Sequence, residues 1–299
     1  MLRRSFLQLL ASGVLFALLG TRARALPGPY FFSHGVASGD PLVDAVILWT
    51  RIGGGSGESV GVRWQVARDA AMRSVLASGV AETGADRDYT VKVDAQGLPS
   101  GTRLYFQFSV GDVRSPVGRT ATTAAGSLDA AKFAVVSCSN YPYGYFHAYR
   151  DIAERDDIDA VIHLGDYIYE YGMGEYATER AEMLGRVPDP LNEILTLSDY
   201  RRRYAQYRGD PDLQAMHGRH PVIAVWDDHE IANDGWRDGA ENHGNHAEVD
   251  ERAWSARRDA AIQAWFEWLP VRGEPNGRKT RIFRDFRWGD LLQLVMLDT

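Results

Sequence analysis

Three short apolar runs in the second half of the chain each end in side chains that can bind a metal ion. They are residues 133–137 before Cys138, residues 160–164 before Gly165-Asp166, and residues 222–226 before Asp227-Asp228-His229-Glu230. Continuous apolar runs of this length, separated by segments with helical spacing, are typical of strands buried on both faces of an α/β sheet. A fourth run, 291–297, follows the same pattern. The pattern predicts an α/β layered domain over residues 132–299.

The residues that follow these runs point to a metal site. Ligands of open α/β sheets bind outside the carboxyl ends of the strands, so Cys138, Asp166 and Asp228 are expected to meet at one edge. Carboxylates crowded there repel one another, and metal cations remove that repulsion. Cys138 is the only cysteine and cannot form an internal disulfide. The alternative to a metal ligand at this position is a buried, inert cysteine.

Four further details assign expected roles within this site. Gly165-Asp166 places a carboxylate on a tight turn, where it could bridge two metals. Tyr169 lies three residues on, within reach of the same side, although a lone tyrosine is commonly a packing residue. Thiolate, phenolate and carboxylate together suit a hard trivalent ion such as Fe³⁺. His229 is placed to bind a phosphate oxygen or to protonate a leaving group.

The first 25 residues are predicted to be a signal peptide. Arg3-Arg4 precede Ser5-Phe6-Leu7, then an apolar stretch, and then the small residues of a cleavage site. The pattern favours a twin-arginine signal, with an ordinary Sec signal or an N-terminal anchor as alternatives. The apolar stretch is too short for a stable membrane span. We therefore expect export by the twin-arginine machinery to the periplasm or the medium.

Residues 27–119 are predicted to form a separate β-sandwich domain. Their apolar runs are short and rich in β-branched and aromatic residues, with glycine-rich turns between them. Leu98-Pro99 followed by Tyr105 resembles the tyrosine corner of an immunoglobulin-like sandwich. The expected fold is thus an immunoglobulin/fibronectin-like β-sandwich followed by an α/β domain.

The charge of the chain excludes some partners. The formal net charge is −7, and it becomes −7 − 4 = −11 when Arg3, Arg4, Arg22 and Arg24 are removed with the signal. A surface this acidic disfavours nucleic acid and anionic membranes as partners. It would also repel a phosphate substrate unless cations were bound at the site.

Taken together, these motifs carry a family resemblance over the whole mature chain. The pattern resembles the calcineurin-like metallophosphoesterase superfamily and, more closely, its alkaline phosphatase D (PhoD-like) family. The matching stretches are His34–Pro41, Ile47–Arg51, Ser137–Asn140, Leu164–Glu170, Asp199–Tyr204, Trp226–Asn233 and Leu297–Thr299.

The resemblance implies roles for individual residues. Cys138 and Tyr169 would bind ferric iron, and Asp166 would bridge the iron and a second metal, expected to be Ca²⁺. Asp228 would ligate the second metal, and His229 would take the catalytic histidine position. Asn233 is a weaker candidate for a calcium or phosphate contact.

The expected function is an exported phosphodiesterase or alkaline phosphatase in which metal-bound hydroxide attacks a small or polymeric phosphoester. Two alternatives stay open, a phospholipase D-like lipid hydrolase and an incomplete fragment with only a binding role. Relatives continue past the Leu297-Asp298-Thr299 segment into a second half-sheet with a Gly-Asp-x-His motif. The metallophosphoesterase domain is therefore expected to be C-terminally incomplete here.

Overall fold

The computed structural model describes residues 30–55, 57, 59–243, 251–274 and 281–298, without the side chains of 251–253. The predicted signal peptide, residues 1–25, lies outside these ranges. None of the helices in the described part of the chain is long and apolar enough to cross a membrane.

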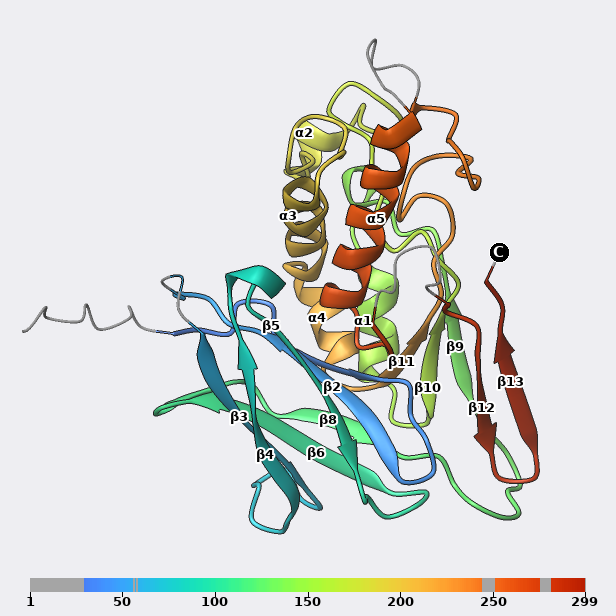
Figure 1. Cartoon of the computed structure of the whole chain (residues 1–299). Helices are drawn as coiled ribbons and strands as arrows, with labels where there is room; N and C mark the ends of the chain where they lie inside the picture. The colour runs from blue at the N-terminus through green and yellow to red at the C-terminus, as the bar shows by residue number, and fades with distance from the viewer. Residues whose placement is uncertain (1–29, 56, 58, 244–250, 275–280, 299) are drawn as a thin grey trace, which may run out of the picture.

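A mixed six-stranded sheet forms the centre of the molecule (Figure 1). Its strand order is β5–β2–β1–β11–β10–β9. The strands are β1 (Val36–Gly39), β2 (Ala45–Arg51), β5 (Thr90–Gln96), β9 (Phe133–Val136), β10 (Ala160–His163) and β11 (Pro221–Ala224). The last three are parallel to one another, and β1 pairs in parallel with β11, with Ser38 opposite Pro221. The predicted α/β sheet is therefore extended by strands from the N-terminal part of the chain.

A second sheet covers the β2 and β5 side of the first. Its strands are β3 (Val60–Ala67), β4 (Val75–Thr83), β6 (Arg103–Val110), β7 (Val113–Arg114) and β8 (Gly118–Ala121). A shared apolar core, which includes Leu48, Val62, Val66, Phe106 and Phe108, fills the space between the layers. The described residues up to 119 thus contribute to two packed β layers. The first of these layers, β5–β2–β1, continues into β11, β10 and β9 beyond the predicted domain boundary at residue 119.

The immunoglobulin-like topology of these layers stays a prediction. Tyr105 is half-buried in β6, and its hydroxyl group makes no hydrogen bond to any described residue. The hydrogen bond that defines a tyrosine corner is therefore not seen in the described part of the chain.

The fourth apolar run does not join the parallel sheet. It forms β13 (Leu292–Met296), which pairs antiparallel with β12 (Arg284–Trp288) in a separate hairpin. The connection has three residues and begins at Gly289, whose φ is +51°. A short loop of this kind reverses the chain, whereas a parallel partner requires a crossover of a dozen residues or more. The run thus forms a strand as predicted, but it is not buried on both faces and lies outside the main sheet.

The predicted burial on both faces is observed for β10 and β11 but not for β9. The residues of β10 and β11 are all buried, whereas Val135 in β9 is 60% exposed. β9 is the last strand in the sheet order, so one of its edges is unpaired. The prediction of a fully buried strand at residues 133–137 was therefore wrong.

Five α-helices and two 3₁₀ turns complete the described structure. They are α1 (His147–Glu154), α2 (Ala181–Leu184), α3 (Leu197–Arg208), α4 (Pro211–His217), α5 (Glu251–Trp268), η1 (Ala85–Arg87) and η2 (Tyr141–Tyr143). Helices α3 and α5 lie side by side (Figure 1). The tyrosines of α3 and Trp265 and Trp268 of α5 are buried in the main core, as their helical spacing predicts. These helices support the turns that follow β10 and β11.

Candidate metal centre

The turns after β9, β10 and β11 meet at one edge of the sheet. These strands are parallel neighbours, so their carboxyl ends lie together. Ligand atoms of Asp166, Asp228 and His229 all lie within 4.8 Å of one another. The structure therefore brings two of the four predicted metal ligands and the predicted catalytic histidine into one cluster.

The turn after β10 depends on a glycine. Gly165 has a φ of +105°, and a Cβ atom added to it would lie 2.3 Å from the backbone nitrogen of Asp227. Only a residue without a side chain lets the two turns approach this closely. Asp166 follows with a φ of +54°, a left-handed conformation that is uncommon outside glycine. The Gly-Asp pair is thus explained by the contact between the β10 and β11 turns.

Cys138 lies on the neighbouring turn, also in a left-handed conformation, with a φ of +59°. Its backbone N–H donates to the Gly165 carbonyl at 3.2 Å, and the Ser139 N–H donates to the Asp166 carbonyl at 2.9 Å. The thiol is exposed and interacts with the side chains of Asp166 and Tyr169. A hydrogen bond with Ser137 lowers the pKa of this thiol, but partial burial and the Asp166 carboxylate raise it more.

Tyr169 reaches the same cluster from the segment after β10. Its hydroxyl donates to Asp166 Oδ2 at 3.0 Å, and its ring centroid lies 4.2 Å from that of His229. Burial and the Asp166 carboxylate raise the pKa of the phenol. The structure thus places Cys138, Tyr169 and Asp228 around a common member, Asp166.

The polar groups of this cluster fit a bound cation. Asp166 Oδ1 is buried and has no hydrogen-bond partner among the described residues. Burial raises the pKa of Asp166, and the Asp228 charge adds to this effect. Two residues after Cys138, both side-chain polar atoms of Asn140 are also buried without a described partner. A metal ion would supply the missing partner of Asp166 and stabilise its charged form.

His229 is held by Glu170, a residue to which the sequence analysis assigned no role. Its Nδ1–H donates to Glu170 Oε2 at 2.8 Å, and Glu170 is fully buried. Burial lowers the pKa of His229, but the hydrogen bond and charge of Glu170, with the charges of Asp166 and Asp228, raise it to about 9. Glu170 therefore orients the His229 ring and favours its charged form.

Asn233 contributes to this support through its backbone. Its N–H donates to Glu170 Oε1 at 2.7 Å, and its side-chain nitrogen donates to the Glu241 carboxylate. The Asn242 side chain also donates to Glu170 Oε1, at 2.7 Å. A substrate or metal contact of the Asn233 side chain stays a prediction.

Glu230 joins the turns after β10 and β11. Its two carboxyl oxygens accept the backbone N–H groups of Asp166 at 3.0 Å, Tyr167 at 2.6 Å and Asp227 at 2.9 Å. Burial raises the pKa of Glu230 to about 8, although these N–H donors oppose the shift. Its position directly after Asp228-His229 was the available signal, because an acidic side chain there can fold back on the preceding turn.

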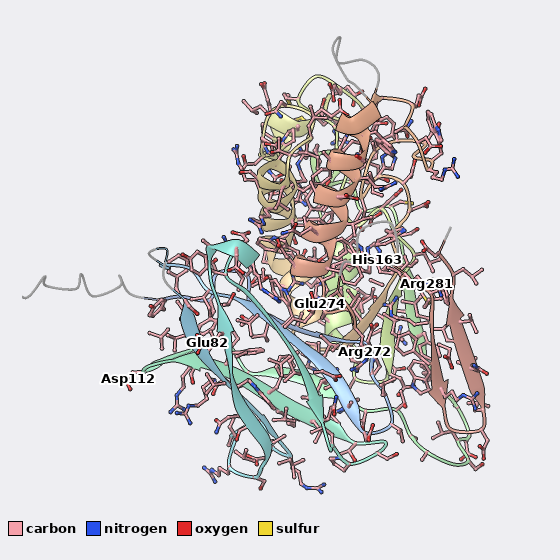
Figure 2. The ribbon with its side chains drawn as sticks, viewed as in Figure 1. Glu82, Asp112, His163, Arg272, Glu274 and Arg281 are labelled. Atoms are coloured by element: carbon pink, nitrogen blue, oxygen red, sulfur yellow. The ribbon has the colours of Figure 1, made fainter. Side chains whose placement is uncertain are left out.

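Hydrogen bonds of His163 and Tyr149 connect the turn after β9 with the turn after β10. His163, labelled in Figure 2 at the end of β10, accepts the Gly165 N–H at Nδ1 at 3.3 Å. Its Nε2 therefore carries the proton and donates to Tyr149 Oη at 3.1 Å, and Tyr149 pairs with Ser139 Oγ. Burial lowers the pKa of His163 to about 3, so the ring is neutral. His163 thus links the residues beside Cys138 and Asp166.

Comparison with known proteins identifies the chain's relatives. The chain is 40% identical over 281 residues to alkaline phosphatase D of Bacillus subtilis (strain 168), a match that covers 90% of this chain and 47% of that protein. A solved structure described as the structure of PhoD superposes with a TM-score of 0.82 at 39% identity, covering 90% of this chain and 52% of that one. The chain thus spans about half the length of the relatives it matches.

Two segments match family definitions. Residues 20–124 match the N-terminal domain of PhoD-like phosphatases, and residues 133–299 match the PhoD-like phosphatase domain itself. The second match covers more than half of the chain. The protein belongs to the PhoD-like phosphatase family.

Proposed function

We propose that this protein is an exported, metal-dependent phosphoesterase whose active centre is the cluster around Asp166. The observation that carries the proposal is the convergence of Asp166, Asp228 and His229 within 4.8 Å, with a buried carboxyl oxygen of Asp166 that has no described partner. The relationship to alkaline phosphatase D supports the reaction class.

The donor set supports two different metals. Cys138 and Tyr169 would hold Fe³⁺, since thiolate and phenolate suit a trivalent ion better than they suit Ca²⁺. Asp228 would hold Ca²⁺, and Asp166 would contact both ions. When bound, such metals act as Lewis acids and lower the pKa of water.

The protein side chains then supply orientation and a proton. Glu170 fixes His229 and favours its charged form, so His229 can donate a hydrogen bond to a phosphate oxygen or a proton to the leaving-group oxygen. Glu230 holds the backbone of the two turns at a fixed separation. The substrate class that we propose is a phosphodiester or phosphomonoester.

Metal analysis of matched variants tests this proposal. Purified protein should retain iron and calcium and should show a visible absorption band of a tyrosinate-to-iron charge transfer. Tyr169→Phe should abolish the band, whereas Tyr143→Phe, which changes an exposed tyrosine, should not. A band that survives in Tyr169→Phe, or iron content that is unchanged in Cys138→Ala, would overturn the ligand assignment.

Substrate comparison separates the reaction classes. An aryl phosphodiester should be hydrolysed by the metal-loaded protein. Hydrolysis of phosphatidylcholine without any cleavage of the aryl diester would instead support the phospholipase alternative. Metal retention without hydrolysis of either substrate would support a binding role.

Export is proposed from the N-terminal sequence. Arg3 and Arg4 stand directly before Ser5-Phe6-Leu7. Replacing both arginines by lysine keeps the charge and should block twin-arginine export, whereas a Sec signal tolerates the change. Unchanged delivery of the double lysine variant to the periplasm or medium would contradict the twin-arginine assignment.

A further inference from the structure

A second concave region lies at the opposite ends of the parallel strands. A cavity of about 360 Å³ is lined by β6 and β8 and by the segments that lead into β10 and β11. β10 has four residues, so roughly 13 Å of strand separates this cavity from the turn that contains Asp166. We call it the arginine cavity, after Arg103, Arg119 and Arg219 in its wall.

One of the three arginines is fully engaged in the fold. Arg119 is 6% exposed, its Nη1 pairs with Asp156, and its Nε donates to the Arg219 carbonyl at 2.8 Å. Its backbone N–H also donates to the Gly218 carbonyl at 2.8 Å. Arg119 therefore fixes β8 against the chain that enters β11, and this role needs no ligand.

The other two arginines keep donors that the fold does not use. Arg219 Nη2 donates to Asp156 Oδ1 at 2.9 Å, and Arg103 Nη2 donates to the Asp156 carbonyl at 2.7 Å. The Nε and Nη1 groups of Arg103 and Arg219 make no hydrogen bond to a described residue. Contact with Asp156 thus uses one Nη group of each guanidinium, and both arginines also belong to the wall of the cavity.

The charge in this region is not balanced. Three arginines and one carboxylate, Asp159, line the cavity, and a second carboxylate, Asp156, pairs with Arg119 and Arg219. Burial lowers the pKa of Arg119, and the charges of Arg219 and Arg103 add to this effect despite the bond to Asp156. The arginines in the wall of the cavity therefore outnumber its carboxylates, in a chain whose net charge is −7.

We propose that the arginine cavity binds an oxyanion of the phosphate class, held by Arg103 and Arg219. Guanidinium groups present paired N–H donors that match the oxygens of phosphate, and such charge-assisted bonds are the strong ones among hydrogen bonds. A cavity of about 360 Å³ has room for a phosphate group and a small substituent. Because its wall comes from both the N-terminal β layers and the α/β part, a bound anion would stabilise their association.

Phosphate binding to metal-free protein tests the proposal separately from the proposed function. Without metal, the cluster at Asp166 carries excess negative charge and repels phosphate, so the arginine cavity is the expected binding site. In EDTA, inorganic phosphate should raise the thermal unfolding midpoint in a saturable way at constant ionic strength. The double variant Arg103→Gln/Arg219→Gln should bind phosphate about 100-fold more weakly, or about tenfold for each arginine.

Two matched variants control for charge and folding. Arg68→Gln/Arg73→Gln removes the same charge from two exposed arginines between β3 and β4 and should bind phosphate like the wild type. Arg103→Lys/Arg219→Lys keeps the charge without the paired donors and should show an intermediate affinity. If the glutamine variant is unfolded without phosphate, the lysine variant alone carries the test.

The outcomes distinguish the anion and the site. Equal binding of phosphate and glycerol 3-phosphate would assign the site to phosphate groups in general, and preference for phosphate would assign it to the free anion. Unchanged affinity in both cavity variants would overturn the proposal. So would phosphate binding that requires metal and is abolished by His229→Ala alone. Hydrolysis by Arg103→Gln/Arg219→Gln should stay within about twofold of the wild type, so failure of either proposal is recognised independently.

Discussion

The two ends of the parallel strands place histidines in opposite electrostatic environments. At the carboxyl end, burial lowers the pKa of His229, but Glu170 and the nearby carboxylates raise it to about 9. At the amino end, burial together with the charges of Arg51 and Arg208 lowers the pKa of His34 to about 4. The same side chain is therefore charged at one end and neutral at the other at pH 7. The contrast comes from the neighbouring charges, which are carboxylates around His229 and arginines around His34.

The largest effect should come from removing the common member of the metal cluster. Asp166→Asn should lose both metals and reduce hydrolysis by more than the ~100-fold that follows loss of a supporting residue. The control is Asp159→Asn, at the amino end of the same strand, which should keep activity and metal content. Metal analysis and aryl diester hydrolysis measure the difference. Equal loss in both variants would show that the two ends are not functionally distinct.

A smaller effect is expected from the residue that holds His229. Glu170→Gln should reduce kcat by about 100-fold, because a neutral partner orients the His229 ring less well and stabilises its protonated form less. The pKa of His229 should fall from about 9 toward its ordinary value of 6.5. The charged form would then be lost as pH rises through about 6.5, so the alkaline limb of the kcat profile should move to lower pH.

Glu175→Gln is the control for this change, since Glu175 lies in the same segment and caps the Gly172 N–H instead. An unchanged alkaline limb in Glu170→Gln would contradict the role of the Glu170–His229 pair.

The buried hydrogen bonds that join Ser139, Tyr149 and His163 should affect both the stability of the fold and its metal affinity. Tyr149→Phe removes the hydroxyl group between Ser139 and His163. We expect a loss of about 1–3 kcal/mol in the free energy of unfolding, because His163 keeps a buried donor without a partner. Iron affinity should fall by about tenfold, and Tyr145→Phe provides the exposed control. Urea unfolding measures the stability and iron titration measures the affinity. A loss of stability with unchanged iron affinity would show that these hydrogen bonds support the core and not the metal site.

The last effect concerns acid stability at the amino end. His34 has a folded pKa of about 4, below its ordinary 6.5, so the unfolded chain binds a proton that the folded chain does not. Stability should therefore fall as pH decreases from about 6.5 to 4, by up to about 3 kcal/mol from this residue. His34→Gln should show a shallower decline in urea unfolding at pH 7, 5.5 and 4.5. Parallel curves for the two proteins would contradict the assignment.

The sequence pattern predicted which turns meet at one edge of the sheet better than it predicted the order of the strands. Cys138, Asp166 and Asp228 follow neighbouring parallel strands, and this is a local property that apolar runs and their ends report. The pairing of β1 with β11 is a contact between distant segments, and no local pattern in residues 36–39 indicates which strand will lie beside them. The hairpin of β12 and β13 was missed because β12 alternates arginine and aspartate with aromatic residues and does not form an apolar run.

The supporting residues of the site were harder to predict than its ligands. Glu170 and Glu230 act through hydrogen bonds to His229 and to backbone N–H groups, and these depend on the conformation of the turns. Residue type and spacing do not separate Glu170 from an exposed acid, whereas the position of Glu230 directly after Asp228-His229 was an available signal. The need for such buried acids becomes clear only from the turns themselves, which are left-handed at Cys138 and Asp166 and approach closely at Gly165.

The parallel pairing of β1 with β11 also has a consequence for synthesis of the chain. Gly39 and Val222 are partners, so some 180 residues separate the two strands. At ~5–20 residues per second, a ribosome takes about 10–40 s to make the intervening segment. During that interval one edge of β1 has no partner, and an unpaired strand edge is a site for mispairing. The N-terminal part of this protein must therefore be protected until much of the chain has been translated.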